Sequence, residues 1–209
     1  MFRMVVALAS VTMLPLLECY LNTPVPSLLQ IHRSTIEQLK ISPATKPLDS
    51  EIGVDDMFYL RHVLEYDVGN EEDDEGGLAL MTAVGTTLRW RRNEGKFIVE
   101  AAAKAVDEAT SGGGGSWNND PVARAAPHAS RILPFVDNSI LTTSARSSDL
   151  IYCIRAGSID DAGLMKKVSE EELTDFFLYA KEVNAIVADR RSLQSGRFCT
   201  VMTANDLSK

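Results

Sequence analysis

The chain has 209 residues, of which 45% are hydrophobic and 24% are charged. These proportions are typical of a folded globular protein with one or two domains, and they exclude disorder along the whole chain. The formal net charge is −8 at pH 7. Nucleic-acid binding is therefore not expected, because phosphate contacts need a clustered basic surface that this net charge would oppose.

Residues 1–50 are predicted to hold an apolar start followed by a linker. The run Met4 to Leu17 has the length of a signal peptide and is too short for a typical membrane span. Pro15 and the poor cleavage sequence Glu18-Cys19-Tyr20 leave a signal peptide and a buried or amphipathic segment as alternatives. Leu21 to Ser50 is rich in Pro, Ser and Thr, and we interpret it as a linker with one short helix at Ser34 to Ile41.

Residues 51–110 are predicted to form a helical module. Leu78 to Arg92 and Lys96 to Thr110 have the pattern of two helices. The second helix carries a side rich in alanine, which permits close packing: Ile98, Ala101, Ala102, Ala105 and Ala109. Between Thr110 and the next strand we predict a linker, residues 111–148, that contains the flexible run Ser111 to Ser116 and the turn formers Asn118 to Pro121.

Residues 149–209 have the pattern of a strand, a helix and a second strand. Asp149 to Arg155 is β-branched and aromatic and is closed by Ala156-Gly157, which indicates a mostly buried strand. Ser169 and Glu172 form a capping box, so a helix is expected to begin near Glu170. Its buried face is predicted to contain Leu173, Phe176, Phe177, Ala180, Val183 and Val187.

The polar run Asp189 to Arg191 is expected to end this helix, and Arg197 to Ala204 is predicted to be the second strand. A strand, helix and strand of this length favour a parallel strand pair joined by a crossover helix. The predicted fold class is therefore α/β, and the chain is expected to end partway through that fold.

No catalytic constellation is found in the sequence. The glycine run lacks the Lys-Ser/Thr of a phosphate loop, the three histidines are isolated, and no Gly-x-Ser-x-Gly motif occurs. Cys19, Cys153 and Cys199 lack metal-ligand spacing and are interpreted as reduced thiols, with the last two buried in the predicted strands. We expect neither an enzyme nor a bound metal or cofactor.

Residues 50–209 carry a family resemblance. A strand ending in an Arg/Gly turn, an Asp, a long helix containing Glu and a strand ending in Asp-Leu occur at Arg155, Gly157, Asp160, Glu182, Asp206 and Leu207. This pattern resembles the opening of the CRAL-TRIO lipid-binding domain, whose members include phosphatidylinositol-transfer proteins. Upstream, Asp55 to Arg61, Tyr66 to Val68 and Leu88 to Arg91 are similar to the helical module that precedes that domain.

The resemblance implies a helical module followed by the first part of a mixed sheet, at residues 149–209, that encloses a lipid. It implies lipid binding or transfer, with phosphatidylinositol as one candidate ligand and transient contact with a membrane surface. The location is open: a cytoplasmic or membrane-peripheral location is favoured, and the apolar N-terminus leaves secretory or organellar targeting as the alternative. Alternate residues of a strand point to the same side of the sheet. The even-numbered residues of the two predicted strands are therefore expected to face the lipid cavity: Tyr152, Ile154, Phe198, Thr200 and Met202. The alternative function is a truncated interaction module that does not bind lipid.

Overall fold

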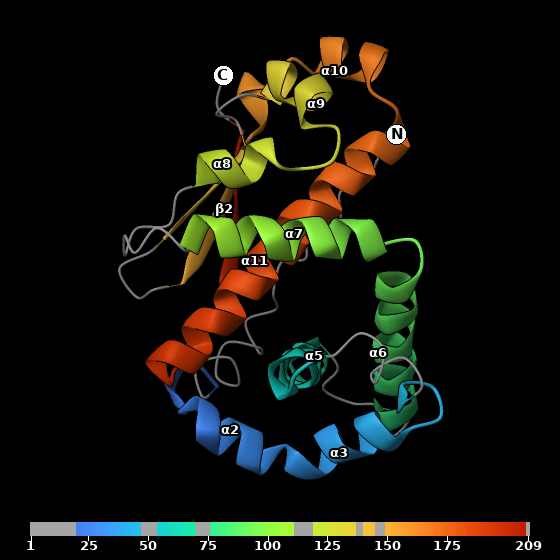
Figure 1. Cartoon of the computed structure of the whole chain (residues 1–209). Coiled ribbons are helices and arrows are strands. Elements are labelled where there is room, and N and C mark those ends of the chain that lie inside the picture. Colours follow the sequence, from blue (N-terminus) through green and yellow to red (C-terminus); the bar gives the residue numbers. More distant parts are fainter. Residues whose placement is uncertain are drawn as a thin grey trace. The chain divides into compact units, whose positions relative to one another are not determined.

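The computed structural model describes residues 20–46, 54–69, 76–110, 119–136, 140–144 and 149–207 (Figure 1). The chain divides into two compact units, which are described separately. The first contains residues up to Arg89 together with Gly196–Phe198, and the second contains Trp90–Ser195 and the residues from Cys199 onward. The helix at Lys96–Thr110 thus belongs to the second unit, although the sequence placed it in the N-terminal helical module.

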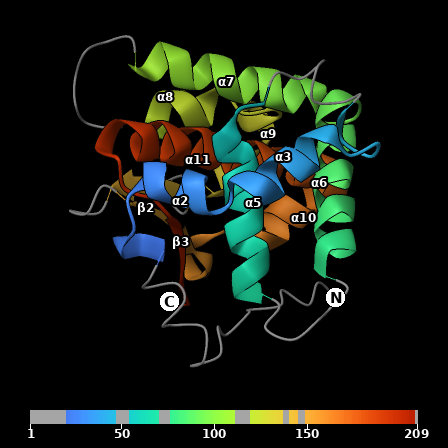
Figure 2. The same ribbon diagram turned by 90° about the horizontal axis from the view of Figure 1, so that it is seen from below.

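The first unit is helical. It contains α2 (Val25–Ile31), α3 (Arg33–Ile41), α5 (Asp56–Gly69) and most of α6 (Gly76–Arg92). Helices α2 and α3 both pack against α5 (Figure 2). The core side chains are apolar, and the most buried are Leu28, Leu39, Met57, Tyr59, Leu60, Val63, Val84 and Leu88.

The prediction of a linker at residues 21–50 was therefore wrong for its described part, although the short helix within it is confirmed by α3. Val25 and Leu28 of α2 are buried in the core of the first unit. Two of the prolines in this segment, Pro24 and Pro26, lie at the start of α2, where Pro24 is the N-cap residue. Proline is tolerated in the first helical turn, because the N–H that it lacks would have no partner within the helix.

A short segment from near the C-terminal end of the chain completes the first unit. The backbone N–H of Val25 donates to the carbonyl of Gly196 at 2.8 Å, and Pro24 and Arg197 form an antiparallel bridge. The Phe198 ring is 5% exposed within the core, and the guanidinium of Arg61 lies 4.8 Å from the ring centroid. Phe198 is therefore a core residue of the helical unit.

The second unit contains helices and a small sheet. Its elements are α7 (Lys96–Thr110), α8 (Asn119–Arg124), α9 (Ala129–Val136), β1 (Ile140–Ser144), β2 (Leu150–Arg155), η2 (Ala156–Ser158), α10 (Asp161–Lys167), α11 (Glu170–Ser195) and β3 (Val201–Asp206). The prediction of a linker at 111–148 was wrong for α8, α9 and β1, since Val122 and Ile132 are buried in the core. Ser111 to Ser116 lies outside the described residues.

The sheet has the strand order β1-β2-β3, with β1 antiparallel and β3 parallel to β2. The predicted parallel pair with a helical crossover is thus confirmed, with α10 and α11 in the crossover. The second strand begins at Val201 and not at the predicted Arg197, because residues 196–198 belong to the first unit. The second unit is rich in helix and has a small mixed sheet, in agreement with the coarse α/β prediction.

Helix α11 is the longest element, and its start was predicted correctly. The N–H of Glu172 donates to Ser169 Oγ at 3.2 Å, and the N–H of Ser169 donates to Glu172 Oε2 at 2.9 Å. The predicted end at Asp189–Arg191 was wrong, because the helix continues to Ser195. Gly196 follows with φ of +69°, a conformation that glycine adopts without strain and that commonly ends helices.

The face of α11 that packs on α7 largely agrees with the sequence pattern. Phe176, Val183 and Val187 of the predicted set are buried, and the other predicted members are half-buried. On α7, Ile98, Ala102 and Ala105 are buried as expected. Within the part of the chain that the structure describes, no helix is long and apolar enough to cross a bilayer.

Candidate functional site

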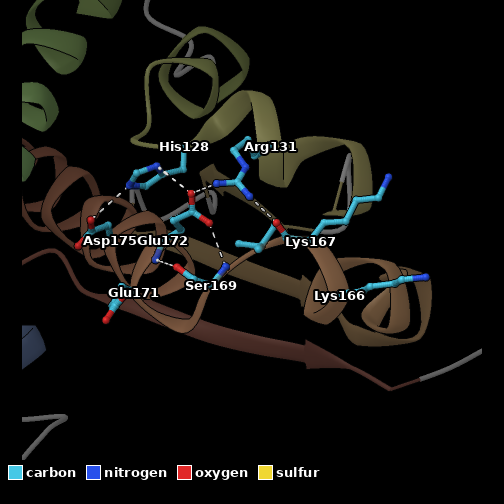
Figure 3. A pocket seen from close by; sticks show the side chains of 9 residues that line it. His128, Arg131, Lys166, Lys167, Ser169, Glu171, Glu172 and Asp175 are labelled. Carbon is cyan, nitrogen blue, oxygen red and sulfur yellow. Dashed lines mark hydrogen bonds and ion pairs between the residues drawn. The ribbon is translucent and has the colours of Figure 1, made fainter.

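A polar surface depression of about 610 Å³ lies where α9 and α10 meet the start of α11 (Figure 3). It is lined by His128, Arg131, Lys166, Lys167, Val168, Ser169, Glu171, Glu172 and Asp175. The sequence pattern predicts the Ser169–Glu172 helix cap, but it does not indicate the histidine or the arginine that join these two residues. No spacing in the sequence relates the α9 residues to α11, because they meet only in the folded chain.

His128 is placed at this depression by an uncommon backbone conformation, with φ of +59°. Its carbonyl accepts hydrogen bonds from the backbone N–H groups of Arg131 and Ile132 in the first turn of α9, and its ring lies between two carboxylates of α11. Nδ1 lies 3.7 Å from Glu172 Oε1, and Nε2 lies 3.4 Å from Asp175 Oδ2. Arg131 donates to the same Glu172 oxygen and, at 2.5 Å, to the carbonyl of Lys167.

Glu172 is the centre of this cluster. The pKa of its carboxyl is lowered, first by the hydrogen bond from the Ser169 N–H and further by the charges of Arg131 and His128. The central polar groups of the depression therefore satisfy one another. We interpret the cluster as a structural contact that stabilises the packing of α9 on α11, since these groups already have partners without any ligand.

Replacing Glu172 by glutamine should lower the free energy of unfolding at pH 7. It should also make that free energy less dependent on pH in the acid range. A carboxyl whose folded pKa is depressed contributes stability above its unfolded pKa, and that contribution is lost as the pH falls through the folded pKa. Urea unfolding midpoints of the native chain and of Glu172→Gln should therefore converge between pH 7 and pH 3. The control is Glu171→Gln at the exposed neighbouring position. Parallel profiles for Glu172→Gln and the native chain would contradict the role of Glu172.

The five residues expected to line a lipid cavity are not brought to one surface. Paired residues of neighbouring strands share a face, and the register pairs Tyr152 with Thr203 and Ile151 with Met202. Tyr152 and Ile154 thus lie on one face of the sheet and Met202, 63% exposed, on the other.

The remaining two expected residues have other partners. Thr200 precedes β3, and its N–H and Oγ1 lie 2.9 and 3.3 Å from Asp149 Oδ1. Phe198 belongs to the core of the first unit. The prediction that even-numbered residues of both strands share one face was therefore wrong. In the observed pairing, Leu150 lies opposite Val201, so even-numbered residues of β2 share a face with odd-numbered residues of β3.

Tyr152 differs from its neighbours because its polar atom is buried and unsatisfied. The side chain is 8% exposed, and among the described residues its hydroxyl has no hydrogen-bond partner. Burial raises the pKa of this phenol above its ordinary value, and the group therefore remains a neutral hydrogen-bond donor at physiological pH. Tyr179 provides the contrast: its hydroxyl donates to the carbonyl of Val122 at 2.8 Å, and burial raises its pKa to about 12.

The face that carries Tyr152 is covered at one end and open at the other. Leu150 is fully buried in the core of the second unit, Ile154 is half-buried, and Thr203 and Asn205 on β3 are exposed. Tyr152 lies between these two ends.

A second buried polar contact joins Arg91 in the last turn of α6 to Glu182 in α11, both in the second unit. Arg91 donates to Glu182 Oε2 at 2.5 Å, and the two side chains are 14% and 12% exposed. Burial raises the pKa of Glu182, against the opposing effect of Arg91. No sequence spacing relates Arg91 to Glu182, because the two residues are 91 positions apart in the chain.

The cysteines and potential metal ligands form no further site in the described residues. Cys153 is half-buried and Cys199 is buried, and Cys19 lies outside the described residues. No group of three histidine, cysteine or acidic side chains is placed to hold a metal ion in the described part of the chain.

Comparison of the chain with protein-family models, with curated proteins and with solved structures finds no match. The resemblance to the CRAL-TRIO family and the lipid-related function that it implies therefore stay predictions.

Proposed function

We propose that the chain binds a hydrophobic ligand of lipid type on the partly covered face of the sheet, with Tyr152 as the polar contact. The observation that carries this proposal is the buried Tyr152 hydroxyl, which has no hydrogen-bond partner among the described residues. Leaving a buried hydroxyl unsatisfied costs about 1–3 kcal/mol. A ligand oxygen that accepts its hydrogen bond would recover part of that cost.

The surroundings of Tyr152 suit the apolar part of such a ligand. Leu150 and Ile154 lie on the same face, one on each side of Tyr152 along β2. Burial of each methylene group contributes about 0.8 kcal/mol, so eight enclosed methylenes would contribute roughly 6 kcal/mol. Binding and release of the ligand require no bond chemistry, and the function would be carriage or transfer, as the CRAL-TRIO resemblance implies.

Native mass spectrometry of the purified chain, combined with lipid extraction, tests the proposal directly. After expression in cells that supply mixed lipids, we expect a stoichiometric adduct whose mass matches an extracted lipid. A chain that carries no adduct and takes up none from added lipid would rule the proposal out.

Tyr152→Phe should make the empty chain more stable and the ligand complex weaker. Removing an unsatisfied hydroxyl should raise the free energy of unfolding by about 1 kcal/mol, and the loss of the contact should weaken ligand binding by about five- to tenfold. The matched control is Tyr179→Phe, which should lower stability by about 1 kcal/mol because the carbonyl of Val122 loses its donor. Urea unfolding and titration with lipid measure both effects, and a loss of stability in Tyr152→Phe would contradict the assignment.

The second candidate is an interaction module that takes up an extended, basic peptide along β3. Strand β3 is terminal in the described sheet, and Met202 on it is largely exposed. An exposed strand edge can pair with an added strand, and the chain's net charge of −8 favours a basic partner. A synthetic peptide of alternating lysine and valine should slow amide exchange in β3. Unchanged exchange at saturating peptide would exclude this candidate.

A further inference from the structure

We propose that the ligand oxygen bound by Tyr152 is uncharged, as in an ester, ketone or amide, and is not part of a carboxylate or phosphate. This inference rests on the proposed function and specifies its ligand class.

The strands provide no cation on the face that carries Tyr152. Arg155 is the one lysine or arginine in the three strands, and its position in β2 lies on the opposite face, in register with Asp206 of β3. The strand neighbours of Tyr152 in the register are Thr142 and Thr203, which are uncharged residues. A charged ligand group at Tyr152 would therefore lack an ion-pair partner from the sheet.

The pKa of the Tyr152 phenol agrees with the absence of a strand cation on this face. Burial alone accounts for its raised pKa, and no charged group contributes to the shift. A cation close to the hydroxyl would instead favour the ionised phenol and lower its pKa. The surroundings of the hydroxyl are therefore desolvated, and no charge among the described residues is a stated cause of its raised pKa.

Such surroundings discriminate between neutral and charged oxygens. Burial of an ionised carboxylate without a paired cation is far more costly than burial of a neutral carbonyl, because the charge loses its hydration. One phenol donor satisfies one carbonyl oxygen, whereas it leaves most of the acceptor sites of a carboxylate or phosphate without partners. The site is consequently suited to an apolar molecule with a single neutral acceptor.

The test compares two probes of equal chain length, methyl laurate and laurate, at pH 8, where laurate is ionised. Affinities are measured by titration of the full chain and checked by native mass spectrometry. We expect methyl laurate to bind at least tenfold more tightly than laurate. Tyr152→Phe should weaken binding of the ester by about five- to tenfold and so reduce this preference. The control Tyr179→Phe should retain the preference.

The outcomes separate this inference from the proposed function. Equal or tighter binding of laurate would overturn the inference and leave hydrophobic-ligand binding in place. Failure of both probes to bind would overturn the proposed function and the inference together. Preference for the ester that is unchanged in Tyr152→Phe would show that another group selects the ligand, and the role of Tyr152 would be wrong.

Discussion

Phe198→Ala is expected to lower the free energy of unfolding of the helical unit by about 3–4 kcal/mol. The ring is almost fully buried among the apolar side chains of that unit, and Arg61 lies over its face. Truncation of a buried phenylalanine removes its transfer free energy and leaves a cavity. Urea unfolding, together with hydrogen exchange in α2 and α5, should report the loss in this unit.

The matched control for Phe198→Ala is Met202→Ala at an exposed position of β3. Its expected effect on stability is below about 0.5 kcal/mol, because its side chain is already in water. The pair also tests the lipid-contact role that the sequence pattern suggested for both residues. A Phe198→Ala chain of native stability that lost its lipid adduct would contradict the core assignment.

Arg91→Met is expected to destabilise the second unit by about 3 kcal/mol. The substitution leaves the carboxylate of Glu182 in a largely buried position without its cation, and loss of one partner of a buried ion pair is strongly destabilising. The double variant Arg91→Met/Glu182→Met should recover most of this loss, since neither charge then remains. A double-mutant cycle by urea unfolding measures the coupling.

The effect of Arg91→Met should also depend on pH. Without the arginine, burial raises the pKa of Glu182 further above its unfolded value. A group with a raised folded pKa contributes stability below its unfolded pKa and loses that contribution as the pH rises through the folded pKa. The loss of unfolding free energy in Arg91→Met, relative to the native chain, should thus be smaller at pH 5.5 than at pH 8. Equal deficits at both pH values would contradict this account.

The control for the ion pair is Lys96→Met, because Lys96 and Glu100 form a solvent-exposed pair at 3.9 Å on α7. Exposed pairs contribute about 0–1 kcal/mol, so this substitution should have little effect at either pH. A similar loss in both variants would show that burial is not what makes the Arg91 contact important.

Elements with strong local signals were predicted well. The bounds of α7 agree with the predicted Lys96 to Thr110, and the Ser169–Glu172 capping box marks the start of α11. These signals act over three or four residues, which is the range of contacts within one helix. The end of α11 was missed, because the charged run at Asp189 to Arg191 is compatible with a helix and only Gly196 ends it.

Of the candidate site, the sequence identified Tyr152 as a candidate ligand contact but not the property that now supports its role. A tyrosine in an apolar strand is an ordinary core residue by pattern. Whether its hydroxyl has a partner depends on what packs against it: Tyr179 meets the carbonyl of Val122, which is 57 residues away, and Tyr152 meets no such group among the described residues. That difference arises only in the folded chain.

The sequence by itself determined helices α3, α6 and α7, the start of α11, strand β2 and the parallel pairing of two strands around a helical crossover, because periodicity and caps are local. Tertiary structure decided which face each strand residue occupies. Asp149 accepts the N–H of Thr200 from 51 residues away, and Leu150 then lies opposite Val201. Tertiary structure also decided that Phe198 packs in the helical unit and that His128 meets Glu172. Contacts between residues distant in the chain depend on packing and register, which have no local signature in the sequence.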